Sequence, residues 1–475
     1  MASKVDREER GLARGSGRWI WSSESAVIAA ALVIGAGLSF SSALLNDGDT
    51  SWHLATGQWI LAHRAIPHVD PFSFTFRGGP WTTHEWLPDV IMALCYRLGG
   101  WQALMLPFAL AAAALALIVG RDLTRRMPVR YVLLALAALV LVLAPFALAR
   151  PHVLTWPIVA VWLLLLMRAR EQHRAPPLAA ALVIALWANV HASFLFGLVI
   201  AAFFGLEALI EEGPDRLRAL REWLIFGLAC LAAAFLTPHG LQAFLYPLQV
   251  SGMRALPLIQ EWRATDPVQD WPFVLFCVAA AAAAALRWRT IGLFRLALLG
   301  LLGVMAFLHA RHQPLFAIAA VLLLAPRPRR RSDRSGWSSA LIFAGLAALV
   351  LARLAIPFDR GDSATFPKSA IAALPPALHS QPVFNEYSFG GPLILAGIAP
   401  YIDGRSDMYG DALTIDQNRI VMGDRARFDR AVARWKIKWT ILSPSAPLVR
   451  LLDRDSRWRT LYRDRFAVVH VRRPS

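Results

Sequence analysis

The chain is poor in cysteine and in charged residues. Only three cysteines occur among its 475 residues, and Cys95, Cys230 and Cys277 all lie in or beside apolar segments. Neither a disulfide framework nor a zinc site with thiolate ligands can be built from them. Charged residues make up 17% of the chain, and no motif that reads a nucleic-acid groove is present. The net charge of +17 therefore does not indicate nucleic-acid binding.

Long apolar runs dominate instead. The chain is 57% hydrophobic, its mean hydropathy is +0.47, and several runs approach the length that crosses a bilayer. These values predict a polytopic α-helical membrane protein with about eleven spans. The candidate spans lie near 24–45, 99–120, 131–149, 153–167, 177–190, 194–210, 223–236, 271–286, 291–309, 313–325 and 337–356.

Charge asymmetry between the loops predicts the orientation of these spans. If the N-terminus is cytoplasmic, the inner segments hold 23 Lys and Arg residues and the outer segments hold 7. The N-terminal segment, with Lys4, Arg7, Arg10, Arg14 and Arg18, precedes an apolar run too long for a cleaved signal peptide, so it reads as a signal anchor. The alternation then puts the C-terminal residues outside.

An acidic stretch follows the first apolar run. In Asn46-Asp47-Gly48-Asp49, two carboxylates stand one residue apart at the outer end of a predicted membrane helix. Charged groups at such a position are costly to keep without a use. They are candidate catalytic residues or ligands of a divalent ion such as Mg²⁺ or Mn²⁺; the alternative is that they cap the helix that follows.

Four junctions on the predicted outer face combine polar and basic residues, and they predict a shared polar cavity that faces outward. Taken singly, each junction is equally explained as interfacial decoration. The junctions are Arg150-Pro151-His152, Asn189-Val190-His191, Thr237-Pro238-His239 and His309-Ala310-Arg311-His312.

The first outer loop, 46–98, is too long for a simple connector. Residues 51–63 can form an amphipathic helix that lies in the membrane interface, with Trp52, Trp59 and Ile60 on one side. A second helix is expected from about His84, with Glu85 and Asp89 on one face. These three polar residues either line the cavity or cap and solvate that helix. The loop tryptophans fit an aromatic belt better than a platform that stacks sugars.

Residues 358–475 change character, because charged residues become frequent and the apolar runs shorten to strand length. We predict a small extracytoplasmic α/β domain with a mixed sheet, following a transmembrane domain of residues 1–357. Strands are expected at 382–385, 401–403, 439–442 and 466–470, and helices at about 425–434 and 446–454. The turn Asp403-Gly404-Arg405-Ser406-Asp407 is either structural or an exposed binding loop. No specific motif marks the outer segment 247–272.

These features suit sugar transfer from a polyprenyl-phosphate donor to an acceptor. A carboxylate would deprotonate the acceptor or hold a divalent ion, while Arg and His side chains neutralise the leaving phosphate. Candidate substrate-binding residues are His53, His84, Glu85, Asp89, Arg150, His152, His191, His239, Arg311 and His312. Arg311 and His312 could instead only pair with the acidic loop.

The chain resembles the GT-C superfamily of integral-membrane glycosyltransferases, and within it the bacterial proteins related to family 39, the protein O-mannosyltransferases and the aminoarabinose transferases. The resemblance rests on Asp47-Gly48-Asp49 with Trp52-His53-Leu54-Ala55-Thr56-Gly57, on Trp81-Thr82-Thr83-His84-Glu85-Trp86-Leu87, and on the multi-span layout with an outer C-terminal domain. It implies a catalytic carboxylate in the first outer loop, Asp49 first with Asp47 as its partner. The best-known members have adjacent acids, whereas a glycine separates them here.

The leading interpretation is therefore an inverting hexosyl or pentosyl transferase of the cytoplasmic membrane that acts on its outer face, with a polyprenyl-phosphate-linked sugar and membrane lipid as partners. A transporter or flippase for a lipid-linked or anionic solute would use the same cavity for binding, but the sequence shows no internal repeat and no paired broken helices. A membrane scaffold without catalytic activity is the third interpretation. Changing Asp49 or Asp47 would leave a scaffold unaffected.

Overall fold

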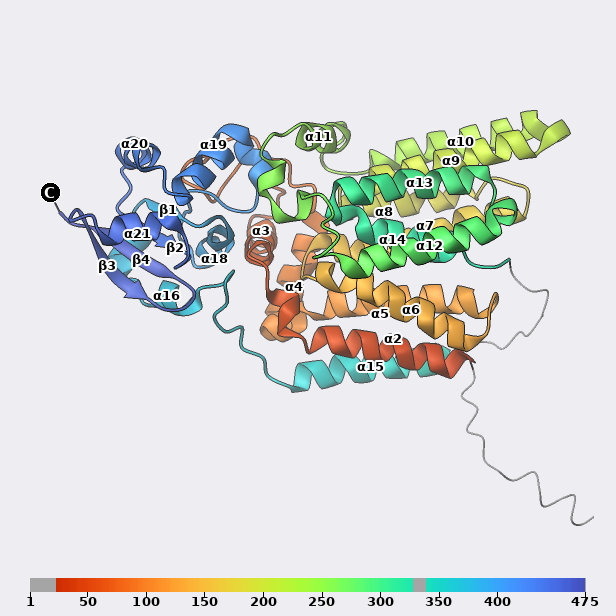
Figure 1. Cartoon of the computed structure of the whole chain (residues 1–475), viewed down its shortest axis with the longest axis horizontal. Helices are drawn as coiled ribbons and strands as arrows, with labels where there is room; N and C mark the ends of the chain where they lie inside the picture. The colour runs from red at the N-terminus through yellow and green to blue at the C-terminus, as the bar shows by residue number, and fades with distance from the viewer. Residues whose placement is uncertain (1–22, 328–338, 475) are drawn as a thin grey trace, which may run out of the picture.

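The computed structural model describes residues 23–327 and 339–474. A layer of long helices that run side by side adjoins a smaller α/β domain formed by the C-terminal part of the chain (Figure 1). The basic N-terminal segment predicted as part of a signal anchor, and most of the basic run 326–334, lie outside the described residues.

The predicted apolar runs form helices, because each provides an uninterrupted stretch of apolar side chains bounded by Pro, Gly or polar residues. Short 3₁₀ turns extend some of them, η3 (Ala144–Phe146) after α6 and η4 (Leu178–Ala180) before α8. These helices are α2 (Ser23–Ser39), α5 (Leu106–Thr124), α6 (Val129–Leu143), α7 (Pro151–Glu171), α8 (Ala181–Val190), α9 (Phe194–Glu211), α10 (Arg216–Ala234), α12 (Trp271–Ile291), α13 (Leu293–Leu308), α14 (Gln313–Leu323) and α15 (Ser339–Ala355).

The length and composition of these helices fit a membrane. Among the described residues, five are long and apolar enough to cross one: α5, α6 with η3, α7, α9 and α12. Five shorter apolar helices, which include α2, α8, α13, α14 and α15, lie beside them. Exposed apolar side chains such as Leu286, 85% exposed on α12, suit contact with lipid. The protein is a polytopic α-helical membrane protein with a small C-terminal α/β domain.

Three predicted spans differ from the observed helices. The run at 24–45 divides into α2, which ends at Ser39, and the 3₁₀ turn η2 (Ser42–Leu45), and the run at 99–120 is divided between the end of α4 (Trp86–Leu104) and α5. The run at 223–236 belongs to α10, which begins earlier, at Arg216, and carries Arg218, Arg221 and Glu222 in its first two turns. Its charged start keeps it out of the group of apolar helices described above.

The first outer loop forms two helices, as expected: α3 (Asp49–His63) and α4 (Trp86–Leu104), the latter kinked at Gly99 and Gly100. Every residue from Thr50 to Gly57 is buried by protein, so the first half of α3 is enclosed on all sides and not on one face only. Its placement in the membrane interface stays a prediction. In Figure 1, α3 lies between the long helices and the C-terminal domain. It packs closely on α4, since a Cβ at Gly57 would lie 1.9 Å from the Asp89 carbonyl oxygen.

The outer segment between α10 and α12 is folded too. It contains α11 (Gln242–Ser251) and two 3₁₀ turns, η6 (Leu256–Leu258) and η7 (Gln260–Trp262). The Ala255 N–H donates to the Asp411 carboxylate of the C-terminal domain at 2.9 Å, so this segment is held against that domain.

The C-terminal domain has a mixed four-stranded sheet in the order β1-β2-β4-β3. β1 (Val383–Asn385) runs parallel to β2 (Trp439–Leu442), whereas β4 (Val468–Arg472) is antiparallel to β2 and to β3 (Trp458–Arg463). The helices of this domain are α16 (Lys368–Ala372), α17 (Pro376–His379), α18 (Gly390–Leu395), α19 (Ser406–Val421), α20 (Arg425–Trp435) and α21 (Pro447–Asp453).

One strand prediction in this domain was wrong, and one strand was missed. Residues 401–403 are a buried loop, because the Asn385 side chain satisfies the Tyr401 N–H and the Ile402 carbonyl at 2.8 Å each and so replaces a strand partner. Strand β3 went unpredicted because its exposed arginines, Arg459 and Arg463, conceal the alternation of an edge strand.

A second hydrophobic core joins the first outer loop to the C-terminal domain. Trp52 and Trp81 from the loop are 6% exposed and cluster with Tyr401 and Ile402. These two tryptophans are therefore core residues and not members of an exposed aromatic belt. Packing of the loop on the domain fixes the position of the acidic stretch at the start of α3.

Candidate functional site

A cavity of about 1020 Å³ lies where the ends of the helices meet the C-terminal domain. It collects residues from the start of α3, the start of α4, the start of α7, the turn between α8 and α9, η7, η8 (Ala310–His312), and residues 386–388 and 404–407. Eight carboxylates and four arginines line it. An excess of acidic groups in a partly enclosed space favours a bound cation.

One wall of the cavity carries an acidic centre. Arg150, the residue before α7, contacts Asp49 and Glu261 directly, and its Nε lies 3.4 Å from an Asp47 carboxylate oxygen. Asp47 also accepts the Asp49 backbone N–H at 2.8 Å, so the helix-capping interpretation is correct for this one bond. One guanidinium thus faces three carboxylates.

Opposing effects act on the pKa of Asp49 in this centre. Burial raises the pKa of Asp49 to about 6, while Arg150 opposes the rise and Asp47 adds to it. Oxygen atoms of Asp47, Asp49 and Glu261 lie within 4.8 Å of one another. Three hard carboxylate oxygens are the donors that Mg²⁺ or Mn²⁺ prefers, so these residues fit a divalent ion.

A second polar group surrounds Glu85 on another part of the lining. Its carboxylate lies 3.5 Å from His191 Nε2, 3.6 Å from His84 Nε2 and 3.8 Å from His53 Nε2. Burial raises the pKa of Glu85 to about 7 and lowers the pKa of His84 to about 4. His53 is itself bonded to Asp89, at 2.7 Å between Nδ1 and Oδ1.

Arg311 lines another part of the cavity. The other lining arginines, Arg150, Arg263 and Arg405, are each ion-paired with carboxylates. Within the described chain Arg311 forms no such pair; its guanidinium lies 4.3 Å from the centre of the Trp262 ring. A partly buried cation without a carboxylate partner is suited to an anionic ligand.

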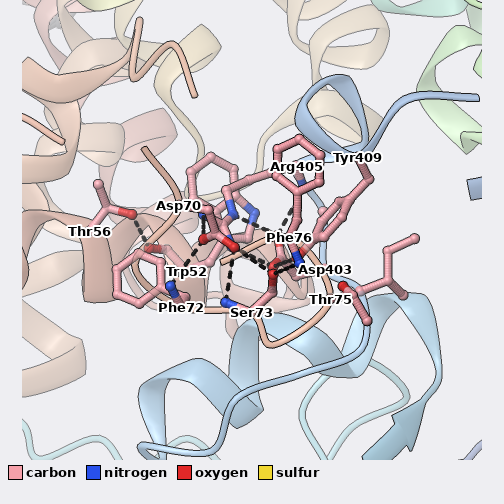
Figure 2. A network of polar contacts seen from close by, with 12 residues as sticks. Trp52, Thr56, Asp70, Phe72, Ser73, Thr75, Phe76, Asp403, Arg405 and Tyr409 are labelled. Atoms are coloured by element: carbon pink, nitrogen blue, oxygen red, sulfur yellow. Dashed lines mark hydrogen bonds and ion pairs between the residues drawn. The ribbon is translucent and has the colours of Figure 1, made fainter. Parts of the chain in front are cut away.

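The turn at 403–407 is structural and also reaches the cavity. Arg405, 1% exposed, bonds both oxygens of Asp403 at 2.7 Å and one oxygen of Asp70 at 2.8 Å. Figure 2 shows Asp70 and Asp403 turned toward Arg405, with Tyr409 donating to Asp403 at 2.6 Å. This buried network, the Arg405 clamp, ties the first outer loop to the C-terminal domain. Gly404, Ser406 and Asp407 of the same turn line the cavity.

The structure places most of the predicted site residues together. The cavity lining includes Asp47, Asp49, His84, Glu85, Asp89, Arg150, His152, His191, Arg311 and His312. Two predicted residues fall elsewhere. His53 is 1% exposed and lies behind Glu85, stacked on Trp52 at 3.6 Å. His239 bonds the Thr83 carbonyl at 2.9 Å and braces the loop from outside the lining.

Other lining residues were missed from the sequence. Glu261 and Trp262 sit in an outer segment without a motif, and Tyr246, on α11, places its ring 4.2 Å from the His84 ring. Asp407 was seen only as part of a turn. The one available signal was the charge of the outer segment, which contains Glu261 between the predicted spans.

Comparison with known proteins identifies the fold. Neither a protein-family pattern nor a curated protein sequence matches the chain. The archaeal oligosaccharyltransferase AglB from Archaeoglobus fulgidus, in complex with an inhibitory peptide and a dolichol-phosphate, superimposes with a TM-score of 0.59 at 10% identity, covering 88% of this chain and 69% of that one. The apo form of the Archaeoglobus fulgidus oligosaccharyltransferase gives a TM-score of 0.51 with the same identity and coverage.

ArnT from Cupriavidus metallidurans, bound to undecaprenyl phosphate, matches 94% of this chain and 97% of its own at 13% identity. Its TM-score of 0.41 adds no weight, so the fold assignment rests on the two oligosaccharyltransferase structures. The chain has the fold of GT-C glycosyltransferases, and the predicted resemblance is confirmed at the level of fold.

Proposed function

We propose that this GT-C-fold protein is a membrane glycosyltransferase that moves a sugar from a polyprenyl-phosphate donor to an acceptor. The observation that carries the proposal is the cavity, in which an acidic centre and an arginine without a carboxylate partner face one enclosed space at the ends of the helices. Transfer from a phosphate donor needs a group that neutralises the leaving phosphate and a base near the acceptor. The cavity offers both.

Arg311 would bind the donor phosphate. Its guanidinium is held against Trp262, and His312 lies on the same turn of the lining. A guanidinium can bond two phosphate oxygens at once, which fixes the direction of the leaving group. A lipid-linked donor would reach this point from the membrane at the ends of the helices.

The acidic centre would hold the reacting end of the donor. Asp47, Asp49 and Glu261 would hold a divalent ion such as Mg²⁺ or Mn²⁺, which when bound offsets phosphate charge. Asp49, with Asp47 as its partner, would be the catalytic carboxylate pair that the family resemblance implies. Arg150 keeps the three carboxylates together, because it contacts all of them.

We place the protein in a bacterial cytoplasmic membrane with its N-terminus in the cytoplasm. The excess of Lys and Arg in the predicted inner segments supports this orientation. The cavity and the C-terminal domain, residues 358–475, then lie on the outer face, beyond a transmembrane domain of residues 1–357. His84, His152, His191 and Asp89 complete the proposed substrate lining.

Reconstitution in lipid nanodiscs tests the proposal. Radiolabelled polyprenyl-phosphate hexoses and pentoses would be offered with and without a membrane-lipid extract as acceptor, and product would be separated by chromatography. We expect Asp49→Asn and Arg311→Gln to lower turnover by about 10²-fold or more, since each removes a charge aimed at the reacting groups. Asp359→Asn, an exposed carboxylate of the C-terminal domain, is the matched control.

Two outcomes would contradict the proposal. One is a complete lack of glycosidic product from the unaltered protein on every donor. The other is movement of the labelled lipid across sealed vesicles without bond formation, which is the behaviour of a flippase.

A further inference from the structure

Glu85 differs from the carboxylates of the acidic centre in what surrounds it. Asp47, Asp49 and Glu261 all share the guanidinium of Arg150. The Glu85 side chain, 12% exposed at the start of α4, has imidazole nitrogens as its ion-pairing neighbours in the described chain. A carboxylate whose lone pairs are not held by a cation can accept a proton from a ligand in the cavity.

The hydrogen bonds of His191 fix its proton. Its Nδ1 accepts the backbone N–H of Ser193 at 3.0 Å, so in the neutral ring the proton sits on Nε2. That nitrogen lies 3.5 Å from Glu85 Oε1. His191 thus faces one Glu85 oxygen, while His84 and His53 face the other at 3.6 and 3.8 Å. At these separations neither oxygen is taken up by a direct hydrogen bond from a ring, and Glu85 lines the cavity.

His53 and Asp89 support Glu85 from behind. His53 Nδ1 and Asp89 Oδ1 lie 2.7 Å apart, both side chains are buried, and His53 Nε2 is 3.8 Å from Glu85 Oε2. The close packing of α3 on α4 at Gly57 holds the two helices, and therefore this row of three side chains, in fixed register. A carboxylate, an imidazole and a second carboxylate in a row hold the outermost group in one orientation.

Charged and titratable groups reach Glu85 from every neighbouring element. They are His53 on α3, Asp89 on α4, His84 just before α4, Arg150 before α7, His191 between α8 and α9, Tyr246 on α11, and Arg311 on η8. Burial dominates over the two arginines and brings the pKa of Glu85 to about 7. A base whose pKa lies near the working pH is available in the required form and still strong enough to take a proton.

We propose that Glu85 is the general base of the reaction and that His53, Asp89 and His191 are its positioning residues. The inference rests on the proposed function. In the step, Glu85 takes the proton of the acceptor hydroxyl, and the hydroxyl oxygen bonds to the anomeric carbon of the donor sugar. The bond from that carbon to the phosphate oxygen breaks, and its electron pair leaves with the polyprenyl phosphate. Asp49 keeps its place in the acidic centre that holds the donor.

Turnover against pH separates this role from a structural one. With a donor on which the unaltered protein is active, turnover should rise with pH through about 7 and then level off. Above pH 7, Glu85→Gln should lose about 10²-fold or more while polyprenyl phosphate still binds. Its turnover should not rise with pH through 7, so the difference from the unaltered protein narrows at lower pH. Glu85→Asp should keep measurable turnover with a displaced profile, and Asp89→Asn should displace it too. Asp359→Asn should match the unaltered protein.

Infrared difference spectroscopy of the same nanodiscs needs no substrate. A protonated-carboxyl band should disappear as the pH is raised through neutrality, be missing in Glu85→Gln and shift its midpoint in Asp89→Asn. Two results would overturn the inference. One is a spectrum that is the same in Glu85→Gln and in the unaltered protein. The other is that Glu85→Gln turns over at close to the rate of the unaltered protein while Asp49→Asn is inactive. If the unaltered protein is inactive on every donor, the proposed function itself is refuted, and the assignment of Glu85 as its general base is refuted with it.

Discussion

The Arg405 clamp allows a prediction whose size follows from the structure. Arg405 is 1% exposed and bonds the carboxylates of Asp70 and Asp403, both of which are fully buried. Arg405→Met keeps most of the side-chain volume over the Trp81 ring but leaves two buried carboxylates without their cation. Removing one partner of a buried ion pair costs about 3–5 kcal/mol. The Ser73 and Tyr409 hydroxyls still bond these carboxylates, so the lower end, about 3 kcal/mol, is expected.

Asp70→Asn is the matched comparison, because Arg405 then keeps its two bonds to Asp403. The Asn oxygen can still accept from Arg405 and from the Phe72 amide, but its NH2 group replaces the oxygen that accepts from Ser73. The cost should be that of the unsatisfied Ser73 amide, about 1–3 kcal/mol. Hydrogen exchange of residues 66–83 measures the effect directly, since the Phe72 and Ser73 amides donate to Asp70. A loss of about 3 kcal/mol raises local opening by about 10²-fold. Protection of this segment that is equal in Arg405→Met and the unaltered protein would refute the reasoning.

Two further predictions concern the cavity. A Cβ at Gly404 would lie 1.7 Å from Asp49 Oδ1, so Gly404→Ala should push Asp49 away from Arg150 and lower turnover, at a stability cost of about 1–3 kcal/mol. Gly227→Ala on α10, where a Cβ meets nothing within 4 Å, is the control that should lower neither turnover nor the melting temperature. Because the pKa of Glu85 is raised from 4.5 to about 7, the folded protein binds the extra proton and loses stability as pH rises through that window. Glu85→Gln should therefore be more stable than the unaltered protein by a margin that grows from about pH 5 to about pH 8 and reaches about 3 kcal/mol. Thermal melting of both proteins at each pH measures this margin, and a margin that does not change with pH would contradict the prediction.

Helix positions were predictable because an apolar run of membrane length has few alternatives to a helix. The eleven predicted runs correspond to helices, with the first two runs divided and α10 displaced toward its charged start. Strands were predicted where apolar residues were continuous, as in β2, and missed where arginines alternate, as in β3. The loop at Tyr401 was misread because its backbone partners come from a side chain, Asn385, and sequence patterns do not register such bonds.

The candidate site was predictable only in part. Histidine and arginine at the ends of spans could be recognised, since polar groups are unusual there, and Arg150, His191 and Arg311 all line the cavity. Glu261 could not be recognised, because nothing near it in sequence distinguishes it from a solvated loop residue. The structure brings it to the acidic centre through the fold of the segment between α10 and α12.

The glycine that separates the two acids has a structural reason. A Cβ at Gly48 would lie 2.2 Å from the Ser388 carbonyl oxygen, and one at Gly391 would lie 2.3 Å from the Gly48 carbonyl oxygen. Together with Gly404 against Asp49, three glycines therefore let the backbone of the C-terminal domain rest directly on the acidic stretch. Adjacent acids would put a side chain into this contact. The glycine between the two acids is thus what allows the C-terminal domain to form part of the wall around Asp47 and Asp49.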